Sequence, residues 1–420
     1  MKGQETLARE LGMIFPLVML AAVLPAWQAP VGFLVGLQFF RSLLIAYQKR
    51  AWHGLEWRGP LPWMALFYLW HLAGMAWSTD QDFGWMDMGM KASLLVFPLI
   101  GMLTPKPGGD GLRRVFIVFA VSGAVVSMIL LLRASWLFAG EWWAVHQGAP
   151  PQGMPWTNHF FSSYYSPEIH PSYLSWYLAM GLLGWSASGA AQRHARWNIP
   201  VITALGVGVL LTASKMGWLV FALVLGHMVW HHRRERVVYR PLFRFLLAGM
   251  VAFMALVAGV RTLRMKVVEA VQAAKGTQTN AEDSSALRVQ VWDVALELAA
   301  AHPLIGTGTG DVKNELVAGY ERKGYLHALE KRLNAHSQYL QSLVALGVPG
   351  LLLLLGCTLW PLIQAMQKGD GPLAVFLLSA VLNFSVESML EVQAGIVFFA
   401  WYGIMLTWLG RSEGMRGPAR

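Results

Sequence analysis

The side chains best suited to chemistry gather around one polar stretch, residues 262–335, in an otherwise strongly apolar chain. His336 follows directly, in the run Asn-Ala-His-Ser-Gln-Tyr-Leu-Gln that leads back into apolar sequence. A neutral imidazole at such a water–lipid boundary can accept a proton from a hydroxyl group. Asn334 is expected to cap the following helix, whose positive dipole end disfavours a charged imidazole. We therefore predict that His336 is a general base.

Four basic residues could bind an anion on the same side of the membrane. Arg288 lies in a predicted helix within the polar stretch. Arg261 and Arg264 stand where the chain leaves the preceding apolar segment, and snorkelling to the interface is the alternative role for both. Lys215 occupies a very short turn between two apolar segments, a costly place for a cation unless an anion meets it. These residue types predict an anion-binding site.

Acidic residues and a second histidine could support such a site. Glu387 lies in a short turn between the last two apolar segments, where it could orient His336 or an arginine. His170 opens another apolar segment on the same side. Asp80 and Asp82 form an Asp-x-Asp pattern, but two nearby aspartates are common by chance. Because no His, Asp and Glu cluster has convincing ligand spacing, we predict no metal and no cofactor.

A glycine-rich run, residues 302–310, reads His-Pro-Leu-Ile-Gly-Thr-Gly-Thr-Gly. Glycine-rich loops can bind phosphate, but a dinucleotide-binding loop follows a strand, whereas this run follows a predicted helix and a proline. A tight turn beside the active site is the better interpretation.

The elements that must position these residues are membrane helices. The chain of 420 residues is 55% hydrophobic and 13% charged, whereas soluble domains average roughly 25% charged residues. A segment inside a bilayer must satisfy its own backbone hydrogen bonds, which favours an all-α fold. About twelve segments are apolar enough to cross, some with tilt. They centre on residues 11–28, 31–47, 61–77, 88–104, 115–138, 171–187, 198–213, 216–231, 243–261, 337–363, 373–386 and 394–410.

Loop charges predict the orientation. Basic residues fill alternate loops and the C-terminal tail, and acidic residues fill the loops between, as the positive-inside rule requires. We therefore expect one membrane domain over residues 1–420, with residues 262–335 as an extracytoplasmic subdomain between the ninth and tenth spans. An aromatic-rich loop, residues 139–170, lies on the same side, either in the headgroup layer or as a wall for a sugar or lipid. The net charge of +10 serves orientation, and nucleic-acid binding is not needed to explain it.

Several short motifs resemble the O-antigen ligase and polymerase-like superfamily of bacterial envelope glycosyltransferases. They are Arg288 with Trp292, the 302–310 run, and the segment from Ala335 to Gln341, which includes Tyr339. The layout of twelve spans with one large periplasmic loop, GT-C-like, is also similar. Thr-Ala-Ser-Lys at 212–215 departs from the family's Ser-Arg, and lysine lacks the bidentate geometry of arginine.

The resemblance implies an inner-membrane enzyme that transfers O-antigen from undecaprenyl pyrophosphate to a sugar hydroxyl of lipid A–core. His336 would be the base, and the anion site would bind the pyrophosphate through Arg288, Lys215, Arg264 and Arg261. Glu387, His170 and Tyr339 would support the site or bind the acceptor. A single in-line displacement would invert the anomeric centre without a metal.

Two alternatives stay open from the sequence. One is a polymerase or a protein O-oligosaccharyltransferase of the same superfamily, although a polymerase is expected to have two large arginine-rich outer loops. The other is a lipid-linked sugar transporter, which is expected to line its spans with polar residues. The spans contain few such residues, mainly Arg41, His71 and His227.

Overall fold

A computed structural model describes residues 12–49, 59–147, 158–231, 259 and 284–414. All regular elements in these ranges are helices, which confirms the predicted all-α class. Each expected apolar segment in these ranges coincides with a helix or a helix pair. Most of the segment at 243–261, together with Arg261 and Arg264, lies outside the described residues.

The chain divides into two compact units. The first unit comprises residues 1–17, 31–109 and 273–420, and the second comprises residues 18–30 and 110–272. The single membrane domain expected from the sequence stays a prediction.

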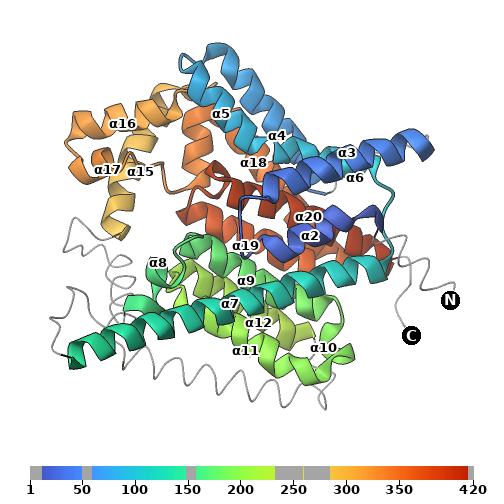
Figure 1. Cartoon of the computed structure of the whole chain (residues 1–420). Coiled ribbons are helices and arrows are strands. Elements are labelled where there is room, and N and C mark those ends of the chain that lie inside the picture. Colours follow the sequence, from blue (N-terminus) through green and yellow to red (C-terminus); the bar gives the residue numbers. More distant parts are fainter. Residues whose placement is uncertain (1–11, 50–58, 148–157, 232–258, 260–283, 415–420) are drawn as a thin grey trace. The chain divides into compact units, whose positions relative to one another are not determined.

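The first unit is a helical bundle built around α18, the helix that follows His336. Helix α18 packs against α4, α15 and α19, and α6 packs against α3, α4 and α20. Large apolar side chains such as Trp401 and Phe376 are fully buried in it. Figure 1 shows these helices, which are α3 (Val31–Lys49), α4 (Leu61–Gly74), η1 (Met75–Trp77), α5 (Gln81–Lys91), α6 (Ser93–Leu103), α15 (Ser284–Ala301), α16 (Val312–Lys323), α17 (Leu326–Glu330), α18 (Gln338–Lys368), α19 (Gly371–Val386), η4 (Met389–Glu391) and α20 (Gln393–Gly414).

Helices α15, α16 and α17 pack on one another and form the described part of the polar stretch (Figure 1). Helix α15 has one apolar face, which is buried. Its residues are Leu287, Val291, Val294 and Leu298, all with low exposure. A side chain at Gly319 of α16 would collide with Val294, so this glycine permits the close approach of α15 and α16.

Helix α18 is broken at Gly347, whose φ of 65° and ψ of −166° are not helical. Pro349 follows and has no N–H, so the carbonyl of Ala345 has no partner four residues on. The 302–310 run replaces the missing bonds: the N–H groups of Thr307 and Gly308 donate to the carbonyls of Val344 (2.8 Å) and Ala345 (2.9 Å). Irregular backbone at membrane depth is tolerated only when other protein groups satisfy it in this way.

The second unit contains a long helix, α7 (Gly109–His146), and a bundle in which α9 packs against α11 and α12. Helix α7 measures about 57 Å at 1.5 Å per residue, roughly twice the hydrocarbon thickness. The predicted loop at 139–170 is therefore wrong at its start, since α7 continues through Trp142 and Trp143 to His146. The other elements are most of α2 (Phe15–Val23), η2 (Asn158–Phe160), α8 (Ser162–Tyr165), α9 (Pro171–Ala187), α10 (Ala190–Arg193), η3 (Ala195–Trp197), α11 (Asn198–Leu211) and α12 (Lys215–His231).

Five helical segments in the described residues are long and apolar enough to cross a membrane. Two shorter apolar helices, α11 and α19, accompany them. The chain is therefore a multi-pass helical membrane protein, while the count of about twelve spans stays a prediction. The five segments are Val31–Lys49, Gln81–Leu103, Gly109–His146, Gln338–Lys368 and Gln393–Gly410.

Candidate active site

His336 lies immediately before α18 in a left-handed backbone conformation, with φ of 44°. The side chain of Asn334 accepts a hydrogen bond from the His336 N–H at 3.0 Å and closes a short turn. The N-cap of α18 is Ser337, whose hydroxyl accepts from the Leu340 N–H at 3.5 Å. The prediction of Asn334 as the cap, with His336 in the first turn, is wrong. The asparagine instead shapes the turn that presents His336 beside the helix N-terminus.

Glu387 holds the imidazole of His336. The His336 Nδ1 atom lies 3.1 Å from Glu387 Oε1, and the two side chains are 26% and 11% exposed. A carboxylate can only accept a hydrogen bond, so Nδ1 carries the hydrogen in this contact. In the neutral ring, Nε2 then has a free lone pair, the arrangement that a general base needs. Glu387 thus contacts His336, and its expected role in orienting His336 or an arginine stays a prediction.

Arg288 approaches the same carboxylate from α15. Its Nε atom donates to the Val386 carbonyl at 3.0 Å, and its terminal nitrogen lies 4.0 Å from Glu387 Oε2. The side chain is 26% exposed, so it remains accessible to an anion. The backbone contact fixes the stem of the guanidinium, while the positive charge lies close to the His336–Glu387 pair. The structure thus brings together three predicted site residues, from α15, the turn before α18 and the end of α19.

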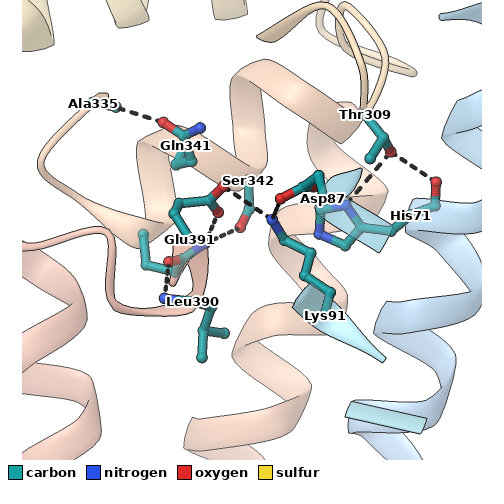
Figure 2. A network of polar contacts seen from close by, with 10 residues as sticks. His71, Asp87, Lys91, Thr309, Ala335, Gln341, Ser342, Leu390 and Glu391 are labelled. Carbon is teal, nitrogen blue, oxygen red and sulfur yellow. Dashed lines mark hydrogen bonds and ion pairs between the residues drawn. The ribbon is translucent and has the colours of Figure 1, made fainter. Parts of the chain in front are cut away.

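The glycine-rich run is a structural connection, as the sequence favoured over phosphate binding. Its N–H groups bind protein acceptors: in addition to the two bonds to α18, Gly310 donates to the Ser78 hydroxyl at 2.9 Å. The Thr309 hydroxyl donates to the His71 carbonyl at 2.7 Å, and Figure 2 shows the two residues side by side. A side chain at Gly306, which has φ of 70°, would collide with the backbone of Ala345.

Asp311 fastens this run to the turn before α5. Its carboxylate accepts from the N–H and hydroxyl of Thr79 at 2.7 and 2.8 Å, and from the Asp80 N–H at 2.7 Å. Burial raises the pKa of Asp311, but these hydrogen bonds outweigh it and hold the pKa below its usual value. Asp80 caps α5 through the Phe83 N–H and also binds Asn314. Asp80 of the Asp-x-Asp pattern is thus a helix cap, and the described residues contain no group of three or more His, Cys, Asp or Glu side chains that could hold a metal ion.

One ionic cluster that the sequence interpretation missed lies inside the first unit. The ammonium group of Lys91, fully buried, contacts Asp87 at 2.5 Å and Glu391 at 2.9 Å (Figure 2). Glu391 also accepts a hydrogen bond from Gln338, the first residue of α18, at 3.0 Å. A lysine at the edge of an apolar segment is the one signal that could have drawn attention to it.

Two predicted site residues belong to the second unit. Lys215 is the first residue of α12 and is half-buried, behind Ser214, whose hydroxyl accepts from the Gly217 N–H. His170 is the N-cap of α9, and its ring accepts from the Ser172 N–H at 3.4 Å. Their roles in anion and acceptor binding stay predictions, as do those of Arg261 and Arg264.

Tyr339 points away from solvent and onto α19. Its hydroxyl donates to the Val381 carbonyl at 3.2 Å, and its ring packs edge-on against Phe384. These contacts join α18 to α19, the two helices whose ends carry His336 and Glu387. The role of Tyr339 in supporting the site or binding the acceptor stays a prediction.

Comparison with known proteins supports the resemblance drawn from the motifs. A model of the O-antigen ligase family matches residues 200–355. The matched segment contains Lys215, Arg288 and His336, and it ends just after the break in α18. A search of curated proteins found no match.

Proposed function

We propose that this protein is an O-antigen ligase, which transfers a glycan from undecaprenyl pyrophosphate to a sugar hydroxyl of lipid A–core. The observation that carries the proposal is the arrangement of His336, Glu387 and Arg288 at the point where the chain re-enters its apolar part. A base and a fixed positive charge side by side are what this transfer needs. The match to the ligase family supports the choice of substrates.

In the proposed reaction the acceptor hydroxyl attacks the anomeric carbon of the donor glycan. A new carbon–oxygen bond forms as the bond to the pyrophosphate oxygen breaks, and the leaving group takes the electron pair. The hydroxyl proton passes to His336 Nε2, while Glu387 stabilises the resulting imidazolium through Nδ1–H. Arg288 stabilises the charge on the leaving pyrophosphate. A single displacement of this kind inverts the anomeric configuration.

The charges of the loops support a proposal for the side of the membrane on which the site lies. We propose that the enzyme lies in the bacterial inner membrane with about twelve spans and that α15–α17 lie in the periplasm. Lys215, Arg261 and Arg264 are proposed to complete the pyrophosphate site, with His170 beside the acceptor. The reaction would then take place at the water–lipid boundary, where an amphiphilic donor and an amphiphilic acceptor can both be reached.

The test is product analysis with purified protein and lipid-linked glycan. Lipid A–core, a second lipid-linked glycan and a serine-containing acceptor protein are offered separately, and the products are identified by mass spectrometry. We expect the glycan on lipid A–core and no product with the His336→Ala variant. Elongation of the second glycan would identify a polymerase, and glycan on the protein an oligosaccharyltransferase. Either result would refute the ligase proposal.

A further inference from the structure

The cluster of Asp87, Lys91 and Glu391 joins α5 to η4, the short helix that begins two residues after Glu387 of the candidate active site. Asp87 and Lys91 come from α5, whereas Glu391 ends η4, the short helix directly after Glu387. Lys91 and Asp87 are at most 3% exposed, so water screens their interactions with each other and with Glu391 only weakly. Buried charges are retained only when they are paired and hydrogen-bonded, and here each partner is.

Gln338 carries the connection from this cluster to α18. Its amide nitrogen donates to Glu391 Oε1 at 3.0 Å, and its amide oxygen accepts from the Leu390 N–H at 2.6 Å. Both atoms of one buried amide are therefore bound to η4. Gln338 stands two residues after His336, and Leu390 stands three residues after Glu387. Lys91, Glu391 and Gln338 thus form a chain of hydrogen bonds, here called the relay. The relay fixes the two backbone segments whose side chains form the His336–Glu387 contact.

We propose that Lys91, acting through Glu391 and Gln338, is a positioning residue for the His336–Glu387 pair, an inference that rests on the proposed transferase function. Lys91 does not reach the reacting atoms itself. Its ammonium group orients one oxygen of Glu391, which leaves the other oxygen for Gln338. The directional bonds of this relay set the register of α18 against η4, and that register sets the distance between the imidazole and the carboxylate.

The alternative is a purely structural role, and the chemistry of the cluster distinguishes the two. Apolar residues of similar volume stabilise a protein interior as well as a buried ion pair does, so stability alone does not call for these charges. Lys91 has two carboxylate partners, but only Glu391 continues to α18. A structural role predicts similar effects from neutralising either carboxylate, whereas a positioning role predicts an effect from Glu391 alone.

Glu391→Gln and Asp87→Asn form a matched pair of isosteric variants. In Glu391→Gln one oxygen becomes an NH₂ group that faces a donor, either Lys91 or Gln338, so one link of the relay must break. Gln338 cannot rotate its amide to compensate, because its oxygen binds the Leu390 N–H. In Asp87→Asn the remaining oxygen can still accept from Lys91, and the relay stays complete. Gln338→Leu cuts the relay without removing any charge.

The experiment measures the tautomer of His336 and the rate of transfer in all three variants. Protein labelled with ¹⁵N-histidine is studied by NMR, with the His336 signals assigned by their loss in His336→Ala. We expect the wild type and Asp87→Asn to show one tautomer with hydrogen on Nδ1, and Glu391→Gln and Gln338→Leu to show a mixture. The single-turnover rate at saturating donor should fall by about 10- to 100-fold in those two variants, with donor binding unchanged.

Two outcomes would overturn the positioning role. One is an unchanged tautomer in Glu391→Gln and in Gln338→Leu, and the other is an equal loss of rate in Asp87→Asn. If Glu391→Gln fails to fold, Gln338→Leu still decides, because it leaves the charged cluster intact. The NMR measurement needs no turnover, so absence of transfer by the wild type would refute the proposed function and leave the positioning role to be judged by the tautomer.

Discussion

Replacing Glu387 by glutamine should slow transfer without weakening donor binding. In the wild type the carboxylate lies 3.1 Å from His336 Nδ1 and stabilises the imidazolium that forms when the base accepts its proton. Two unit charges at this separation interact by about 5 kcal/mol at an effective dielectric constant of about 20. Both side chains are partly exposed, so the net value is closer to a charge-assisted hydrogen bond, roughly 1.5–3 kcal/mol. Since about 1.4 kcal/mol changes a rate tenfold, the rate should fall roughly 10- to 100-fold.

Donor affinity should respond differently. Arg288 is anchored by the Val386 carbonyl at 3.0 Å, and its distance to Glu387 is 4.0 Å. Removing the carboxylate charge therefore leaves the guanidinium in place with less of its charge compensated, so affinity for an anionic donor should hold or rise. The assay measures donor binding by titration with the lipid pyrophosphate, and the rate by single turnover.

The control for Glu387→Gln is Glu387→Asp, which keeps the charge and moves it by one methylene. It should recover part of the rate, because its carboxylate can still pair with an imidazolium. A Glu387→Gln rate within about twofold of the wild type would refute the pairing as a catalytic contact. So would a loss of donor binding equal to that of Arg288→Ala.

Five further results are expected. His336→Ala should lower the transfer rate by at least about 10²-fold while donor binding persists, since a base acts on the acceptor proton; unchanged turnover would make His336 a structural residue. Arg288→Ala should weaken both binding and turnover, and Arg288→Lys should restore only part, because a point charge lacks the guanidinium fork; full recovery would contradict this. Transfer should survive EDTA, whereas loss that manganese or magnesium restores would favour the Asp-x-Asp pattern as a metal site. With Cys357, the single cysteine of the chain, replaced by serine, Ala318→Cys on the exposed face of α16 should react with an impermeant maleimide before the inner membrane is lysed. Reaction only after lysis would contradict the predicted topology. The lowered pKa of Asp311 implies that its stabilising effect is complete above about pH 4 and lost as the pH falls through the folded-state pKa, so Asp311→Asn should remove this acid dependence in limited proteolysis of the loop.

Hydropathy predicted most helices, because a long apolar segment in lipid has few alternatives to a helix. It failed at the end of α7, which continues past the predicted apolar segment to His146, because the end of an apolar run does not by itself end a helix. The cap of α18 was also wrong, because Asn334 and Ser337 are both good capping residues and only the local turn decides between them.

The candidate site was predictable in its members and only partly in its contacts. His336, Arg288 and Glu387 all occupy loops expected on one side, so their proximity followed from topology. The contact of Lys91 with Glu391 could not be predicted in this way, because it joins residues 300 positions apart through the packing of α5 on η4. The charge pattern of a single sequence does not identify which distant residues form such a pair.

The break in α18 has a consequence for biosynthesis. About 10 Å along this helix, the carbonyls of Val344 and Ala345 depend on N–H groups of Thr307 and Gly308. Taken alone, the segment would enter lipid with polar groups that nothing satisfies, at several kcal/mol for each. The 302–310 run precedes α18 in the chain and emerges first from the ribosome. The 302–310 run therefore has to be in place before α18 inserts stably, and the order of synthesis supplies the partner before it is needed.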